Sequence, residues 1–246
     1  MFVAVFYFYI LFISFVVQQT KNHTTMKRII PLLMATLMVA CGSNQTPATK
    51  ATPIEYTDNI ALVQPELNQG TTINQALALR ASSRDYSTEP LSLEELSGVM
   101  WAAAGINRPE SKHLTAPSAM ALYPIEVYAF TPEGVYIYNA ESHSLKRLVE
   151  GDHRTLSATQ EFAYTAPLNL VYIANMETYA GLNLTAEKAL FLAGQDAAGY
   201  AENVNLYAAG HNLKAITRGS LKSDEVIELL GLGDYHKVVL AQTVGK

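Results

Sequence analysis

Apolar side chains recur every three or four residues in four stretches of the chain, and this spacing predicts amphipathic helices. Thr71 or Thr72 caps the first predicted helix, whose apolar side is formed by Ile73, Leu77 and Leu79. The second predicted helix begins with the capping box of Ser92 and Glu95 and ends at Gly105. The third is rich in alanine and runs from Thr185 to about Ile216. The fourth runs from Asp224 to Leu230, with Ser223 as its N-cap and Gly231 at its end.

Alternation of apolar and polar residues predicts strands elsewhere. Residues 125–130 and 135–139 alternate on either side of a short Pro- and Gly-containing turn, which predicts a β-hairpin. Residues 167–174 are almost continuously apolar, as expected of a buried central strand, and residues 237–245 supply a last strand. Residues 105–124 contain Gly and Pro and are predicted to be a loop. Helices mixed with an antiparallel hairpin predict a single α+β domain.

Composition narrows the class of protein. The chain has 246 residues, of which 49% are apolar and 16% charged, so it can bury a sizeable core. Its formal charge of −5, without a block of Lys and Arg, argues against nucleic acid as the main partner. One Cys and six scattered His give no metal-ligand spacing, so we expect no metal site. The folded domain is assigned to residues 59–246.

The amino-terminal residues read as export signals. Residues 1–18 are almost purely apolar and uncharged, long enough for a short membrane span. A second pattern begins at Met26, which two basic residues follow, then the apolar run 29–39 and a small residue before Cys41. The residues that end at this Cys resemble a bacterial lipobox, in which the Cys is lipidated.

Two export segments in tandem make little physical sense. Residues 1–25 are therefore interpreted as an extension from an upstream start codon chosen in error, with a genuine membrane helix as the alternative. Residues 26–40 are then a lipoprotein signal peptide, and residues 41–58, rich in Thr, Ser, Asn and Pro, form a flexible tether. These features predict a protein that is lipid-anchored at Cys41 in a bacterial cell envelope, at the outer membrane or on the periplasmic face.

Three short constellations could carry chemistry. Arg80, Ser82 and Arg84 follow the first predicted helix, and two guanidinium groups with a hydroxyl within about one helical turn match the oxygen-rich surface of a phosphate. The alternative is a pair of solvated arginines that complement a helix dipole.

The second constellation is Pro117-Ser118-Ala119, whose small residues let the backbone approach a flat ligand; the alternative is simply a tight loop. The third is Thr217-Arg218-Gly219, expected at the end of the long helix. There Gly219 suits close backbone approach and Arg218 supplies a cation. A glycine cap preceded by a dipole-compensating Arg is the alternative for this third group.

Taken in order, these segments look like the nitroreductase-like family of FMN-dependent flavoproteins. The resemblance covers roughly residues 58–246 and is carried by ALALRASSRDYSTEPLSLEELSGVMWAAAGINR, APSAMALYPIEVYAF, VYIYN, GDHR, the region of residues 206–219 and VVLAQTVG. It is especially similar to the branch of the azoline-forming oxidases, whose loop reads like PSAxALYP. The resemblance implies an α+β fold with a central, mostly antiparallel sheet flanked by helices. It also implies an intertwined homodimer that holds two FMN molecules at its interface.

The resemblance also assigns residues to the cofactor. Arg80, Ser82 and Arg84 match those that hold the FMN phosphate and ribityl chain, and Pro117, Ser118 and Ala119 match the loop along the isoalloxazine of the flavin bound mainly by the partner subunit. Thr217, Arg218 and Gly219 match the segment at the other edge of the ring, where Arg218 would stabilise reduced anionic flavin, and Lys246 is a further candidate near the phosphate. Met120 and Ala121 stand where relatives often carry Gly or Asn.

The implied activity is that of an FMN-dependent oxidoreductase with ping-pong kinetics. Hydride would pass through flavin N5 from a reduced donor, such as NAD(P)H, to a nitroaromatic, a quinone or a related small molecule. No catalytic side chain is required. Because NAD(P)H is scarce outside the cytoplasm, a dehydrogenase of a peptide or small molecule is an alternative. A flavin- or small-ligand-binding lipoprotein without turnover is another, and an envelope lipoprotein that has lost cofactor binding is a third.

Overall fold

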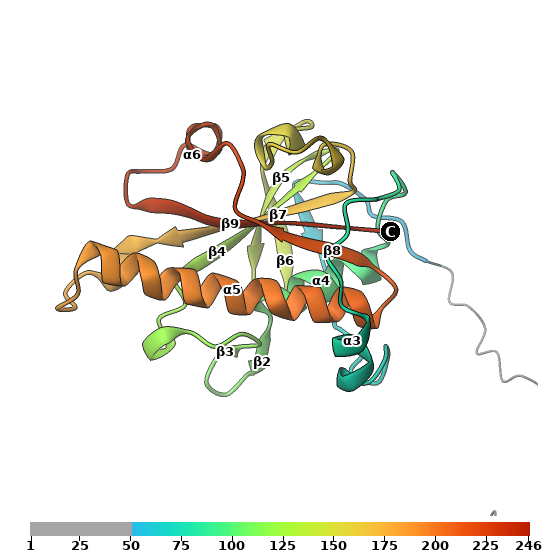
Figure 1. Cartoon of the computed structure of the whole chain (residues 1–246), viewed down its shortest axis with the longest axis horizontal. Helices are drawn as coiled ribbons and strands as arrows, with labels where there is room; N and C mark the ends of the chain where they lie inside the picture. The colour runs from blue at the N-terminus through green and yellow to red at the C-terminus, as the bar shows by residue number, and fades with distance from the viewer. Residues whose placement is uncertain (1–50) are drawn as a thin grey trace, which may run out of the picture. The chain divides into compact units, whose positions relative to one another are not determined.

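A seven-stranded antiparallel sheet is the centre of the fold (Figure 1). The computed structural model describes residues 51–246, so the predicted signal peptide, the start at Met26 and the lipidated Cys41 lie outside the described residues and stay predictions. In the order in which they lie side by side, the strands are β1 (Asn59–Ala61), β6 (Ser144–Glu150), β5 (Gly134–Asn139), β4 (Ile125–Thr131), β7 (Leu168–Asn175), β9 (His236–Gly245) and β8 (Lys214–Arg218).

The middle of the sheet confirms the predicted hairpin and the predicted central strand. β4 and β5 pair directly across a two-residue turn, with Thr131 opposite Gly134. β7 lies between β4 and β9, and its first seven residues are buried. Leu170 and Tyr172 belong to the apolar core on one face of the sheet, whereas Val171 belongs to the core on the other. Both faces are covered, and this explains why residues 170–174 of the strand form a continuous apolar run.

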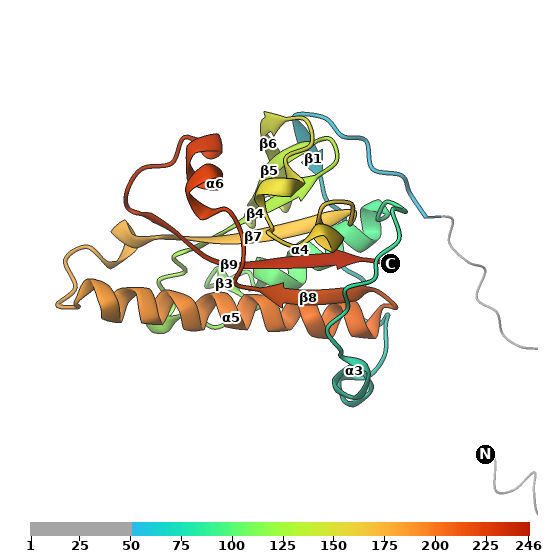
Figure 2. The same ribbon diagram turned by 45° about the horizontal axis from the view of Figure 1, so that its top comes forward.

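Four helices surround the sheet within the described residues: α3 (Ile73–Leu79), α4 (Leu93–Ala104), α5 (Ala186–Gly210) and α6 (Ser223–Leu230). The capping boxes of Thr72 with Gln75 and of Ser92 with Glu95 are both formed. Figure 2 shows α5 along one face of the sheet and α6 on the opposite face. Over residues 51–246, no helix combines the length and apolar character that crossing a bilayer would need.

The apolar side of α3 is not buried within the chain. Ile73, Leu77 and Leu79 are 60%, 55% and 59% exposed, and Ala76 is the buried residue of this helix. Side chains of this kind rarely line one face of a short helix unless another surface covers them. The pattern predicts the helix correctly, but its partner is not found among residues 51–246.

The predicted long helix ends earlier than its alanine-rich pattern suggests. α5 stops at Gly210, and Asn212 then adopts a left-handed conformation with φ of 59° that turns the chain back. Residues 214–218 form the edge strand β8, which pairs with β9. The prediction that Thr217 and Arg218 end a helix is therefore wrong, because the β-branched pair Ile216-Thr217 lies on a pleated surface beside another strand.

Two smaller predictions also need correction. The predicted loop 105–124 contains a short hairpin of β2 (Ile106–Arg108) and β3 (His113–Leu114), followed by the 3-10 turn η1 (Ala119–Ala121). The strands β1 and β6 at the far edge of the sheet were not predicted. In β6, polar Arg147 is half-buried and apolar Leu148 is exposed, so apolar and polar residues do not alternate as they would in a recognisable strand.

Candidate functional site

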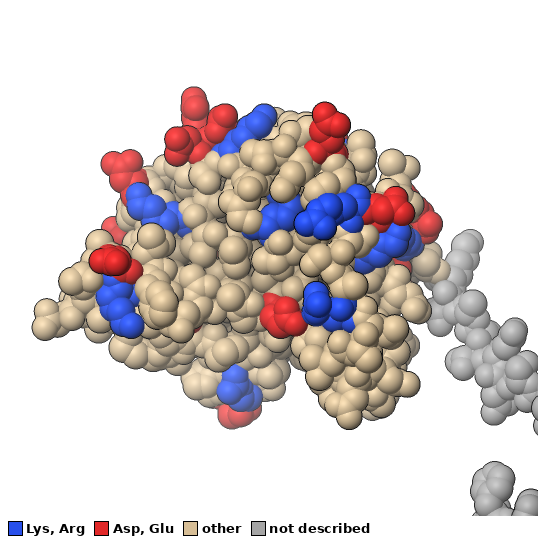
Figure 3. Space-filling model, viewed as in Figure 1, with Lys and Arg blue, Asp and Glu red and all other residues tan. Residues whose placement is uncertain are grey.

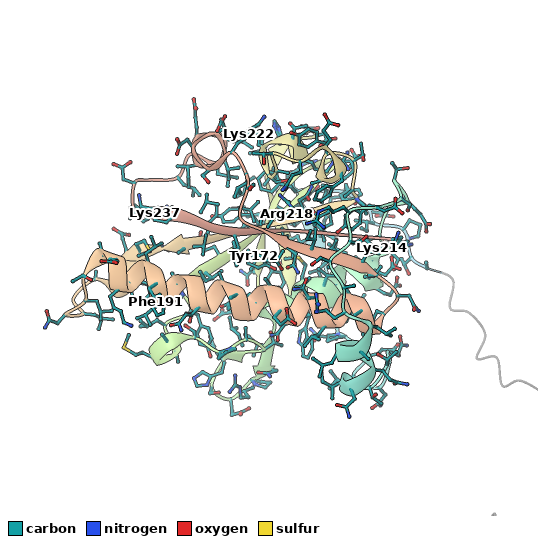
Figure 4. The ribbon with its side chains drawn as sticks, in the orientation of Figure 1. Tyr172, Phe191, Lys214, Arg218, Lys222 and Lys237 are labelled. Carbon is teal, nitrogen blue, oxygen red and sulfur yellow. The ribbon has the colours of Figure 1, made fainter. Side chains whose placement is uncertain are left out.

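Two segments distant in sequence meet at the edge strand β8. Ser82 forms a parallel bridge with Ala215, and the backbone N–H of Ser83 donates to the Ala215 carbonyl oxygen at 3.1 Å. Lys214 Nζ also donates to the Asp85 carbonyl oxygen at 2.9 Å. The structure therefore brings the segment of residues 80–84 beside Lys214 and Ala215 in β8, the strand that carries the third predicted constellation at its other end. Figure 4 labels Lys214 and Arg218 at the two ends of β8.

Arg80, Ser82 and Arg84 lie on extended backbone and not within a helical turn. Arg80 is the C-cap of α3, and its ψ of 119° directs the chain out of the helix. Because side chains alternate in an extended segment, residues 80, 82 and 84 are directed to a common side. All three are exposed, and within residues 51–246 their side chains form no hydrogen bond or ion pair. Their donors are free for a ligand.

Several cations lie around this segment, together with the exposed acid Asp85. Figure 3 shows Lys and Arg side chains gathered along the middle of the visible face, over β8 and β9. Burial raises the pKa of the Tyr86 phenol, and the positive charges of Arg218 and Arg84 both oppose that rise. Tyr86 therefore lies within electrostatic reach of both guanidinium groups. An anion placed at residues 80–84 would be attracted by more than one cation.

Arg218 itself is turned into the protein interior. The residue is 5% exposed, and its guanidinium donates to Thr243 Oγ1 at 3.0 Å, to the Ser157 carbonyl oxygen at 2.9 Å and to Asn169 Oδ1 at 3.1 Å. Burial lowers the pKa of Arg218 to about 10, and the nearby Tyr86 opposes this shift. The donors of this side chain are thus used by acceptors inside the chain, which could not be predicted from the residues around position 218.

The backbone at the end of β8 is more accessible than the Arg218 side chain. Gly219 is exposed, and a Cβ atom built on it would meet no heavy atom within 4 Å. Thr217 faces the other side of the sheet, where its Oγ1 accepts a hydrogen bond from Asn205 Nδ2 of α5 at 3.1 Å. A flat ligand could approach the chain closely at Gly219.

The loop of Pro117, Ser118 and Ala119 packs against a different part of α5. Ser118 Oγ donates to Asp196 Oδ2 at 2.5 Å, and the Ala119 backbone N–H donates to Asp196 Oδ1 at 3.0 Å. Beside the loop is an open pocket of about 510 Å³, whose lining includes Ser118 and, from the β2–β3 hairpin, Arg108. The loop is therefore anchored on one side and open on the other.

The three constellations do not form a single site within one chain. The loop touches α5 at Asp196, and Thr217 touches the same helix at Asn205. Nine residues of helix separate these points by ~13 Å at 1.5 Å per residue. Lys246, the further candidate, is held in ion pairs with Glu89 at 2.6 Å and Glu95 at 3.3 Å, which offset its charge.

Asp196 is the residue at this site that the sequence did not single out. It is 5% exposed, and the neighbouring positions Ala193 and Ala197 on α5 are fully buried. A lone acid on the buried, alanine-rich face of a helix is unusual, because an unpaired buried carboxylate is costly. A single acid among these alanines is the feature of the sequence that could have indicated a buried carboxylate with a specific partner.

The structure is an α+β protein in which the exposed side chains of Arg80, Ser82 and Arg84 lie beside the edge strand β8. Comparison with known proteins agrees with this class. The family model described as the nitroreductase family matches residues 77–246. A curated protein of Methanocaldococcus jannaschii, named as a candidate nitroreductase, is 30% identical over 188 residues, which are 72% of this chain and 93% of the relative.

Solved structures give the same result. A candidate nitroreductase from Ralstonia eutropha superimposes with a TM-score of 0.73 and 32% identity, over 80% of this chain and 94% of that chain. An NADPH:FMN oxidoreductase from Vibrio harveyi, at 18% identity and a TM-score of 0.51 over 70% of this chain and 67% of that chain, shares the fold. The chain belongs to the nitroreductase family, and its α+β fold with a large antiparallel sheet is confirmed. Family membership supports a flavin oxidoreductase.

Proposed function

We propose that this protein is an FMN-dependent oxidoreductase that passes hydride from a reduced donor, such as NAD(P)H, to a nitroaromatic, a quinone or a related acceptor. The family match and the fold shared with an NADPH:FMN oxidoreductase support this reading. When bound, the flavin supplies the hydride chemistry, and the protein supplies binding, orientation and electrostatics.

One observation carries the proposal. The side chains of Arg80, Ser82 and Arg84 are exposed on one extended segment and are unbonded within the described chain, beside β8, which ends just before the open backbone of Gly219. Two guanidinium forks and a hydroxyl suit a phosphate dianion better than any neutral ligand. In this proposal residues 80, 82 and 84 bind the FMN phosphate and ribityl chain, and the backbone of residues 217–219 lies along the edge of the ring.

We also propose that the working form is a homodimer. Within one chain the loop of residues 117–119 contacts α5 at Asp196, and Thr217 contacts α5 at Asn205. These two positions are about 13 Å apart along the helix. A second copy would bring its own loop over the ring, as the family resemblance implies. The uncovered apolar side chains of α3 and of the first turns of α5, Leu190 and Phe191 among them, support burial against another chain. The surface over α3 is nearly all uncharged in Figure 3.

The absorption spectrum of the purified protein tests the proposal. We expect flavin bands in the near-ultraviolet and blue, bleaching by a reductant and recovery of colour on adding a nitroaromatic or a quinone. A yellow protein that none of these acceptors reoxidises would favour a flavin-binding lipoprotein without turnover. Bleaching of the flavin by a peptide or another small molecule, and not by NAD(P)H, would favour the dehydrogenase. A folded protein that stays colourless after incubation with excess FMN would contradict the proposal.

A further inference from the structure

The loop of residues 117–123 has an unusual backbone. Met120, Ala121 and Tyr123 have φ of 56°, 54° and 49°, in the left-handed region that residues with a Cβ atom seldom occupy. Three such residues among four cost free energy that the surrounding structure must offset. The loop is therefore held in shape by its contacts and not by its own preference.

Asp196 supplies those contacts. Its two carboxylate oxygens accept hydrogen bonds from the Ser118 hydroxyl and from the Ala119 backbone N–H. Ser118 Oγ in turn accepts from the Tyr123 backbone N–H at 2.8 Å. A continuous chain of bonds thus links Asp196 to both ends of the left-handed turn. Pro117 packs close to Gly199, one turn further along α5.

The surroundings of Asp196 leave the loop as its partner. No Lys, Arg or His among residues 51–246 forms an ion pair with this carboxylate. Two nearby hydroxyls, those of Tyr179 and Tyr200, are buried without a hydrogen-bond partner in the described part of the chain. Burial raises the pKa of Tyr179 to about 12 and also raises that of Tyr200, and the negative charge of Asp196 adds to both shifts.

We infer that Asp196 is a positioning residue, which fixes the shape of loop 117–123 and so places Pro117, Ser118 and Ala119 against the flavin. The part of the inference that concerns the flavin rests on the proposed function, and the part that concerns the loop does not. Hydrogen bonds to a charged group are stronger than those between neutral groups, and burial away from water strengthens them further. A single buried carboxylate can therefore hold a strained turn.

The test compares Asp196→Ala, Ser118→Ala and the double variant with the unmodified full-length protein. Hydrogen exchange at the Ala119 and Tyr123 amides should accelerate about tenfold or more in Asp196→Ala, because the bonds that protect the loop are lost. The affinity for FMN should fall by about tenfold, and the visible circular dichroism of the bound flavin should change. Because the two residues act through one chain of bonds, the double variant should be no worse than Asp196→Ala alone.

Two further variants separate positioning from general damage. Asp196→Asn keeps one acceptor for Ala119 and can donate to Ser118 Oγ, so it should restore most of the flavin signal. Glu228→Gln, at an exposed acid on α6 whose side chain makes no bond in the described chain, should leave every readout unchanged. If Asp196→Ala does not fold, Ser118→Ala and Asp196→Asn still decide whether the hydrogen bonds of Asp196 hold the loop of residues 117–123.

Unchanged exchange in the loop of a folded Asp196→Ala or Ser118→Ala protein would overturn the inference. So would faster exchange with no change in the affinity for FMN or in the flavin dichroism, because the loop would then not serve the cofactor. If the unmodified protein binds no FMN, the proposed function fails and the cofactor role of Asp196 fails with it. The exchange data would still decide whether Asp196 holds the loop.

Discussion

Replacing Arg80 by alanine is expected to give a folded but colourless protein. Arg80 is exposed and makes no side-chain bond within the described chain, so its loss should not lower the stability of the fold. Charge-assisted bonds to phosphate are among the strongest polar contacts, so the affinity for FMN should fall by about a hundredfold. The measurement is the flavin absorbance that remains after gel filtration, followed by titration of the apoprotein with FMN.

Two variants control this experiment. Lys146→Ala removes another exposed cation, on β6, and should leave the flavin content unchanged. Arg80→Lys keeps the charge but loses the planar fork and should bind FMN with intermediate affinity. An Arg80→Ala protein that keeps a full complement of FMN would show that the phosphate is bound elsewhere.

Replacing Arg218 by glutamine is expected to destabilise the fold strongly. The buried guanidinium donates to Thr243, Ser157 and Asn169, and a shorter amide cannot reach all three acceptors. Leaving buried acceptors unpaired costs about 1–3 kcal/mol each, so the free energy of unfolding should fall by about 3 kcal/mol. Urea denaturation followed by circular dichroism measures this, read as a lower midpoint at an unchanged slope.

The control for this second variant is Lys237→Gln, at an exposed cation on the neighbouring strand β9, which should leave the midpoint unchanged. The family resemblance gives Arg218 a different role, in which its charge stabilises reduced flavin and its loss lowers the flavin midpoint potential. A normal urea midpoint together with a lower flavin potential would support that role and would contradict the structural one.

Much of the fold could be predicted because local signals and tertiary structure agree. The N-cap at Thr72, the capping box at Ser92, the hairpin around residues 131–134 and the buried strand β7 are all predicted correctly. The end of the long helix could not be read from the sequence. Alanine and the apolar spacing favour continuing the helix, and only pairing with β9 makes Ile216 and Thr217 a strand.

The candidate site was predictable in its residue types and less so in its geometry. The sequence placed Arg80, Ser82 and Arg84 together, although on a helical turn and not on an extended segment. It could not show that Arg218 is buried, because that depends on Thr243, which lies 25 positions further along the chain. Nor could it show that Asp196 anchors a loop far from it in sequence.

The central claim, that the segment of residues 80–84 binds the terminal phosphate of FMN, is tested most directly with riboflavin, which has the same ring system and no phosphate. The dissociation constants of both flavins for the apoprotein can be measured by quenching of flavin fluorescence. We predict that FMN binds at least about a hundredfold more tightly than riboflavin, since the phosphate alone engages two guanidinium groups. Equal affinity for FMN and riboflavin would contradict the account.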